Sequence, residues 1–165
     1  MIGYGSVSRS KAALRSELER LLEADLARRE AAHRSAIEGA THEEAKPEND
    51  KDTRALEQSY LARGEAARVE ELRQGLTDVR AMALRAFQEG DPAALGALVT
   101  VSDDPHTWVL WLVPYGGGMR LDGGTVQAVT PKSPLGRAIL GKAAGDACEM
   151  SIGGRERELS IEAVE

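Results

Sequence analysis

The first half of the chain contains two long runs in which apolar residues recur every three or four positions. Between Ser10 and Glu38 there is neither Pro nor Gly, and a second run extends from about Pro47 to Val79. This spacing places the apolar residues on one face of a helix, and Ser10 is a candidate N-cap. We expect Gly39 to stop the first helix and Pro47 to lie in the first turn of the second. The apolar positions are Leu14, Leu18, Leu21, Leu22, Leu26, Ala32, Ala36 and Ile37, then Leu56, Tyr60, Ala67, Val69, Leu72, Leu76 and Val79.

Two helices of about 30 residues can bury such stripes only against each other. The sequence therefore predicts an antiparallel coiled-coil hairpin over residues 9–79, preceded by a short Gly- and Ser-containing lead-in over 1–8. Gly64 and Gly75 each weaken the second helix by about 1 kcal/mol relative to Ala. We expect its last turns to fray from Leu76 onward, with a linker over 80–91.

Beyond Gly90 the hydrophobic period changes from that of a helix to that of a strand. Strands are expected over 95–101, 107–113, 126–129, 147–152 and 155–164, the last two joined by a tight turn at Gly153 and Gly154. One short helix is expected, capped by Ser133 and closed by Gly141. The predicted fold class is α+β, a helical hairpin followed by an antiparallel β domain over 92–165.

Composition narrows the functional classes. The chain has 165 residues, 42% of them hydrophobic and 29% charged, which is typical of a soluble folded protein. A net charge of −6 argues against non-specific nucleic-acid binding over the whole surface. The single cysteine, Cys148, excludes an intramolecular disulfide and is interpreted as a packed thiol. Nothing resembles a signal peptide or a spanning helix, so a cytoplasmic protein without a membrane partner is expected.

Several weaker patterns have ordinary structural interpretations. His33, His42 and His106 are too scattered for a zinc site, and the glycines of YGGGMRLDGGT fit turns better than a phosphate-binding loop. The first helix carries an excess of basic residues. They either form a solvated face or bind a nucleic-acid backbone or an acidic groove of another protein. These residues are Arg9, Lys11, Arg15, Arg20, Arg28, Arg29 and Arg34.

The connection between the two helices, Thr41 to Thr53, is rich in carboxylates. It contains five acidic residues and two lysines. Hard cations such as Mg²⁺ prefer oxygen ligands and often take only one or two from a protein. Such a tip could therefore complete a metal site supplied by a partner, whereas the simpler reading is a solvated acidic turn.

The order of these parts resembles the bacterial GreA/GreB family of transcript cleavage factors, over nearly the whole chain. The most specific segment is VTPKSPLGRAILGKAAGDACEMSIGGRERELSIEAV, residues 129–164, with its SPxxRxxxGK and GD elements. It is similar to the FKBP-like carboxy-terminal domain of that family, and GALVTV at 96–101 is similar to the strand that opens the domain. In the hairpin, Glu48-Asn49, Glu57-Gln58 and Gly64 fall at the spacings of the family's second helix.

The resemblance implies a protein that binds RNA polymerase and inserts its hairpin into the secondary channel. Polymerase contacts are then expected from the carboxy-terminal domain at Ser133, Pro134, Leu135, Arg137 and Lys142. The family's D-x-x-E-N tip helps hold a second Mg²⁺, so that the polymerase itself cuts a backtracked transcript near the RNA 3′ end.

In this chain Glu48 and Asn49 match the tip motif, but Ala45 stands where the family has Asp. Glu44 is the nearest acid that could replace it, so Glu44 and Glu48 are the predicted tip residues and shared Mg²⁺ ligands. No stably bound cofactor and no enzymatic activity of the chain's own are expected.

Three other functions stay open at this point. A non-cleaving inhibitor of the same family would occupy the same channel. A coiled-coil adaptor would explain the hairpin but not the β domain. A prolyl isomerase would need an aromatic-lined apolar pocket, for which Trp108, Trp111 and Tyr115 are a sparse supply.

Overall fold

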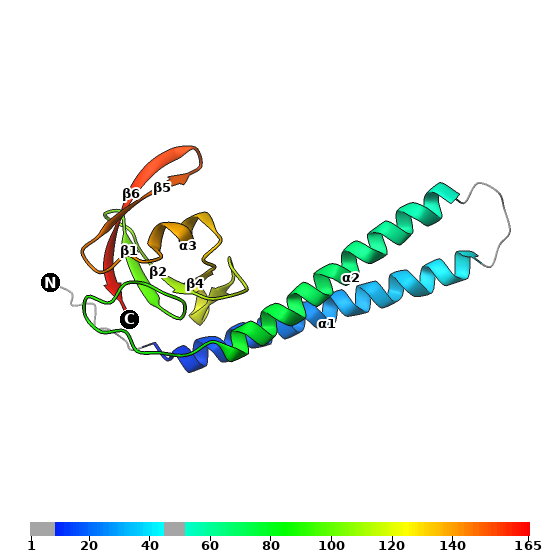
Figure 1. Ribbon diagram of the computed structural model, residues 1–165, viewed down its shortest axis with the longest axis horizontal. Helices are drawn as coiled ribbons and strands as arrows, with labels where there is room; N and C mark the ends of the chain where they lie inside the picture. Colours follow the sequence, from blue (N-terminus) through cyan, green and yellow to red (C-terminus); the bar gives the residue numbers. More distant parts are fainter. Residues whose placement is uncertain (1–8, 45–51) are drawn as a thin grey trace. The chain divides into compact units, whose positions relative to one another are not determined.

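A helical hairpin followed by a β-sheet with one short α-helix makes up the fold, and the predicted α+β class is confirmed (Figure 1). The computed structural model describes residues 9–44 and 52–165. The elements are α1 (Lys11–Glu44), α2 (Asp52–Ala81), β1 (Leu98–Ser102), β2 (Thr107–Leu112), β3 (Arg120–Leu121), the 3₁₀ turn η1 (Asp122–Gly124), β4 (Val126–Val129), α3 (Pro134–Ile139), β5 (Ala147–Ile152) and β6 (Arg155–Val164).

The start of α1 agrees with the sequence, whereas its end does not. Ser10 caps the helix: its Oγ accepts a hydrogen bond from the Ala13 N–H at 3.2 Å. The helix then continues through Gly39 to Glu44, so the expected stop at Gly39 is wrong. A glycine inside a helix costs only about 1 kcal/mol. Nothing lies within 4 Å of the place where a Cβ of Gly39 would sit, so no neighbouring group forces the chain to turn there.

Helix α2 is longer at its carboxyl end than expected. It runs through Gly64 and Gly75 to Ala81, so the fraying predicted from Leu76 is also wrong. Leu76 and Val79 are 5% and 0% exposed, and their burial holds the last turns in place despite the glycines. The expected first-turn position of Pro47 lies outside the described residues.

The chain divides into two compact units. One comprises the chain up to Glu19 together with Asp78–Glu165, and the other comprises Arg20–Thr77. The base of the hairpin therefore belongs to the same unit as the sheet. Residues 82–88, which lie inside the expected linker, have no regular secondary structure. Separate folding of the two expected domains stays a prediction.

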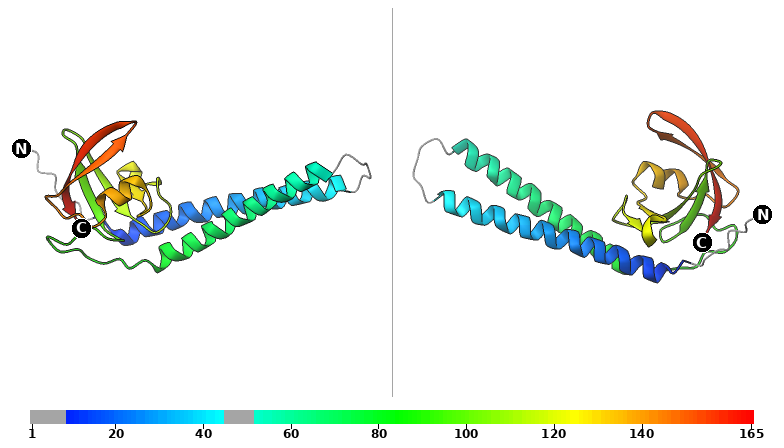
Figure 2. Two further views of the ribbon diagram at one scale, coloured as in Figure 1. Left: turned by 45° about the horizontal axis from the view of Figure 1, so that its top comes forward. Right: turned by 180° about the vertical axis from the view of Figure 1, so that it is seen from behind.

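Within Arg20–Thr77 the apolar stripe is buried over only part of its length. Leu22, Val69 and Leu72 are buried, and the side chains of Glu30 and Arg73 form an ion pair between the helices. Towards the far end α1 and α2 separate (Figure 1 and the right view of Figure 2), and the apolar side chains there are exposed. These are Ile37, Leu56, Tyr60 and Leu61, which are 49%, 57%, 63% and 70% exposed.

The six strands form one mixed sheet in the order β3-β4-β2-β1-β6-β5. The expectation of an antiparallel sheet holds for every pair except β2 and β4, which run parallel in the register Val109↔Val126 to Leu112↔Val129. After β2 the chain crosses to the edge strand β3 and turns back through η1. β4 then enters between β3 and β2, antiparallel to one and parallel to the other.

In the unit that contains the sheet, the main hydrophobic cluster lies on the sheet face that α3 covers. Alternate residues of β1, β2 and β6 point into it, including Val99, Leu110 and Ile161. On the other face Trp111 is fully buried, and its indole Nε1 donates a hydrogen bond to the Gly96 carbonyl at 3.2 Å. None of the described helices combines the length and the apolar character needed to cross a membrane.

Candidate functional site

The loop before α3 and the first turn of that helix form the best-defined part of the predicted docking site. Ser133 is the N-cap, as expected, and Pro134 takes the first helical position. The Ser133 hydroxyl donates to the Thr130 carbonyl at 2.7 Å and accepts from the Gly136 N–H at 3.0 Å. One hydroxyl therefore fixes both the loop and the helix start.

Gly136 allows this turn to close because it has no side chain. A Cβ at Gly136 would lie 1.8 Å from the Thr130 oxygen and 2.7 Å from its carbonyl carbon. Both contacts are with backbone atoms, which cannot swing away as the end of a side chain can. The SPLG sequence thus contains an N-cap, a proline at the first helical position, and a glycine that the nearby Thr130 backbone requires.

The five residues predicted to bind a partner divide into exposed and supporting positions. Pro134 and Arg137 are exposed on α3, whereas Ser133 is occupied as the cap. Leu135 is half-buried and packs against the core. The Lys142 carbonyl accepts a hydrogen bond from the Ala93 N–H at 2.7 Å, which fixes the backbone after the helix. Pro134 and Arg137 are therefore the residues of this group that are best placed to meet another molecule.

Cys148 lies under this region and is confirmed as a packed thiol, 5% exposed. Burial raises the pKa of its thiol, and the positive charge of Lys142 opposes that rise. A thiol that is buried and protonated is a poor nucleophile. Cys148 therefore does not offer a reactive group to the site.

The predicted tip residues are placed only in part. Glu44 is the last residue of α1, and its side chain is not described. Ala45 and Glu48 lie outside the described residues. Within residues 9–44 and 52–165, no three His, Cys, Asp or Glu side chains gather in a way that could hold a metal ion.

Many of the basic side chains of α1 are engaged within the chain. Arg28 and Arg29 both pair with Asp25, at 2.7 and 3.1 Å. Arg15 lies 3.5 Å from Glu19. The hydrogen bond from Arg28 is the largest cause that lowers the pKa of Asp25. These ion pairs favour the interpretation of a solvated, internally paired face over that of a nucleic-acid-binding surface.

A groove of about 760 Å³ lies beside β1 and β6, and it does not suit a prolyl isomerase. Its lining consists of hydroxyl and carboxylate side chains with Pro105, and none of its described lining residues is aromatic. Trp111 is buried in the protein interior, and Trp108 is half-buried with its ring stacked near His106. The aromatic residues of this half of the chain therefore do not line this groove.

Comparison with known proteins gives structural similarity at low sequence identity. No family profile matches the sequence, and neither does any curated protein. Among solved structures, the chain is similar to the transcription factor Gfh1, with 23% identity over 93% of this chain and 94% of that one, at a TM-score of 0.41.

Two further structures give similar values. GreA factor homolog 1 of Thermus thermophilus is 22% identical over 89% of this chain and 94% of its own, at a TM-score of 0.37. The elongation factor GreA/GreB from Nitrosomonas europaea is 24% identical over 60% of this chain and 88% of its own, also at 0.37. At these TM-scores the similarity does not by itself assign a function.

One cluster of charged residues could not be found from the sequence. Lys11 at the start of α1 and Arg85 after α2 are brought together beside the ring of Phe87. They are separated by 74 positions in the chain. No local pattern links them, because only the closure of the hairpin makes them neighbours.

Proposed function

We propose that this chain is a Gre-like regulator of transcription elongation that binds RNA polymerase. The observation that carries the proposal is the combination of an antiparallel helical hairpin with the SPLGRAILGK segment, which forms a capped helix that exposes Pro134 and Arg137 on the β domain. The sequence resemblance supplies the partner, and the element order of the structure agrees with it. The chain would act through the polymerase's active site and would not be an enzyme itself.

The docking surface in this proposal is centred on Pro134 and Arg137. Both are exposed, and both stand on a helix start that Ser133 and Gly136 hold rigidly. An arginine on a fixed element suits a carboxylate of a partner, because its donors form a planar fork. Rigid placement also lowers the entropy lost on binding.

The docking proposal is tested with core RNA polymerase and labelled full-length chain in a fluorescence-anisotropy titration. Arg137→Ala should weaken binding about tenfold, as expected for the loss of a charge-assisted hydrogen bond, with the melting temperature unchanged. Arg120→Ala is the matched control, because Arg120 is also exposed but lies on edge strand β3. Equal affinity of wild type and Arg137→Ala would place the docking surface elsewhere.

In the connection between the two helices, Glu44 and Glu48 are proposed to approach the polymerase's catalytic centre when the hairpin enters the secondary channel. Their carboxylates would supply oxygen ligands to a Mg²⁺ shared with the polymerase, and that ion would promote hydrolysis of the backtracked RNA. We expect cleavage to be weak, because Ala45 replaces the family's Asp and Glu44 would have to reach from a displaced backbone position. A misplacement of about 1 Å can cost on the order of 10²-fold in rate.

RNA cleavage in a stalled, backtracked elongation complex tests the tip. We expect little cleavage by the wild type, a gain with Ala45→Asp, and loss of that gain when Glu48→Ala is added. Strong wild-type cleavage that Glu48→Ala abolishes would identify a working cleavage factor instead. If no tip substitution changes either cleavage or elongation rate, the acidic connection is only a solvated turn.

The same assay separates the non-cleaving alternative. An inhibitory homologue would slow elongation without cleaving RNA, and Glu44→Ala or Glu48→Ala would relieve the inhibition. A coiled-coil adaptor of another class would fail to bind core polymerase at all. A pull-down with core polymerase therefore decides between these classes first.

A further inference from the structure

A second cavity, of about 330 Å³, lies within the unit that contains the sheet and the base of the hairpin. Arg9 and Lys11 line it from the start of α1, and Arg85 and Phe87 line it from the segment after α2. Glu165 is the single acid among the described lining residues. Three cations thus face one carboxylate around a space at the lower end of the range for small-molecule pockets, about 300–1,000 Å³.

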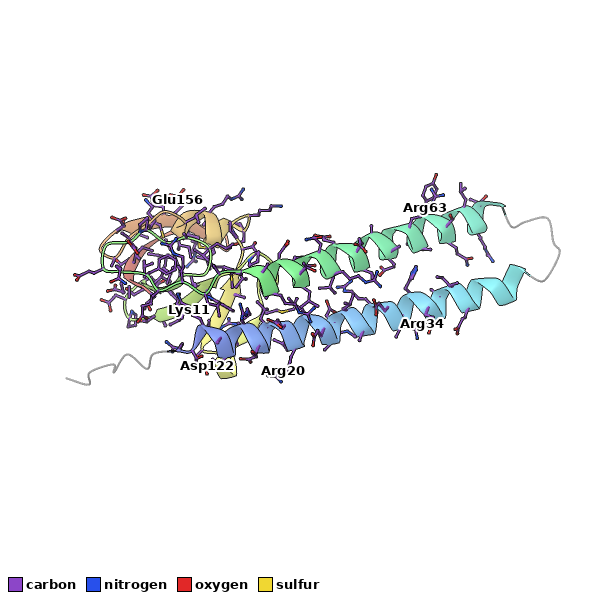
Figure 3. The ribbon with its side chains drawn as sticks, turned by 60° about the horizontal axis from the view of Figure 1, so that its bottom comes forward. Lys11, Arg20, Arg34, Arg63, Asp122 and Glu156 are labelled. Atoms are coloured by element: carbon purple, nitrogen blue, oxygen red, sulfur yellow. The ribbon has the colours of Figure 1, made fainter. Side chains whose placement is uncertain are left out.

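Two of these cations are held in place by the fold. The Lys11 Nζ donates to the Arg85 carbonyl at 2.8 Å and lies 4.7 Å from the centroid of the Phe87 ring (Lys11 is labelled in Figure 3). The Arg85 guanidinium carbon lies 4.4 Å from the same centroid. Phe87 is partly buried and packs against the core, so the ring is an anchored platform for both charges.

The cations are close enough to influence each other. Burial is the main cause that lowers the pKa of Lys11; the charge of Glu165 raises it, and the charge of Arg85 lowers it further. Arg9, the third cation of the lining, pairs with Asp122, whose Oδ2 lies 3.4 Å from the Arg9 Nε. An anion in the cavity would therefore meet positive charges that the fold has already brought together, one of which, Lys11, is partly desolvated, and this reduces the cost of binding.

We propose that this cavity binds a small phosphorylated molecule of about nucleotide size, with its phosphoryl oxygens held by Lys11 and Arg85 and with Arg9 as the third cation. A phosphoryl group carries more charge than a carboxylate and offers several acceptors. Its oxygen acceptors match the planar set of N–H donors of a guanidinium and the three N–H donors of an ammonium group. The proposal does not depend on binding to RNA polymerase.

Calorimetric titration of the full chain at low salt tests the proposal, with inorganic pyrophosphate and ADP as the probes. We expect both to bind and to compete, ADP more tightly because the cavity has room beyond the phosphates. Lys11→Gln and Arg85→Gln should each weaken binding about tenfold, the loss expected for one charged hydrogen bond. Glutamine at position 11 keeps an N–H donor and removes the positive charge, so the variant tests the charge with a small change in polarity.

Two further variants make the test specific. Glu165→Gln removes the negative side-chain charge of the one acid among the described lining residues and should tighten binding, an effect opposite in sign to those of the cation variants. Arg20→Gln removes an exposed charge elsewhere on α1 and should leave affinity unchanged. Thermal melting of each variant without ligand identifies any that is misfolded, and Glu165→Gln and Arg85→Gln keep the test informative if Lys11→Gln is one of them.

Four results would overturn the inference. The first three are that the wild type binds neither probe at millimolar concentration, that the cation variants bind as tightly as the wild type, and that Glu165→Gln weakens binding. A single-stranded oligonucleotide that displaces pyrophosphate and binds at lower concentration than ADP would also contradict it, because the site would then serve a nucleic-acid backbone. Affinity for the phosphorylated probes should fall as salt rises, since Arg85 is exposed and Arg9 and Lys11 are only half-buried.

Discussion

Replacing Gly136 by alanine places a methyl group against the backbone of Thr130. The new Cβ would lie 1.8 Å from the Thr130 oxygen, so the two groups would have to separate by about 1.2 Å to reach 3.0 Å. That movement would stretch the hydrogen bonds of 2.7 and 3.0 Å that the Ser133 hydroxyl makes to Thr130 and Gly136. Overpacking costs about 1–3 kcal/mol and loss of a cap about 1 kcal/mol, against a gain of up to about 1 kcal/mol in helix propensity.

The net loss in the free energy of unfolding should therefore be about 1–4 kcal/mol, or a fall in melting temperature of about 2–16 °C for a chain of this length. Urea denaturation followed by circular dichroism measures it. Gly64→Ala is the matched control: it makes the same chemical change at a helical site with nothing within 4 Å, and should stabilise the chain by up to about 1 kcal/mol. A Gly136→Ala chain within about 0.5 kcal/mol of wild type would refute the steric argument.

Three further outcomes follow from buried and paired side chains. Asp25→Asn should lower the free energy of unfolding at neutral pH by less than about 1 kcal/mol. Because pairing lowers the pKa of Asp25 in the folded chain, the stability difference between wild type and variant should vanish as the pH falls below 3.8 in an acid titration. Cys148, whose pKa burial raises, should be alkylated slowly in the native chain and rapidly in urea, in a mass-spectrometric time course. Leu22→Ala, at a site 0% exposed, should cost about 2–5 kcal/mol in urea denaturation, whereas Leu56→Ala, at a site 57% exposed, should stay within about 0.5 kcal/mol.

Local signals in the second half of the sequence predicted its elements well. The bounds of β4, β5 and β6 agree with expectation, and Gly153 and Gly154 both adopt the positive φ that the tight turn between β5 and β6 requires. The cap and first turn of α3 were likewise readable from Ser133 and Pro134. In each case the determining residues are neighbours in the chain.

Pairings between distant segments could not be predicted in the same way. The parallel alignment of β2 with β4 depends on the path of the chain through β3, a strand of two residues that left no hydrophobic pattern. β1 starts at Leu98 and not at Leu95, because Gly96 has a positive φ and turns the backbone just before the strand. The charged cavity beside Phe87 was missed for the same reason, since its cations come from the start of α1 and from the segment after α2, which are far apart in the sequence.

The hairpin shows why a continuous apolar stripe does not guarantee continuous packing. Near the base, leucines and valines of both helices are buried, as Leu22 and Val69 illustrate. Farther out, the positions of α1 on the stripe include Ala32 and Ala36, whose short side chains offer little apolar surface, and both are exposed. Apolar side chains of α2 at that level, such as Leu56, remain in solvent. Because isolated helices are marginal in water, the outer turns of both helices depend on the packed base for their order. Substitutions at the base should therefore lower the helical order of the far end of the hairpin more than substitutions at the far end itself.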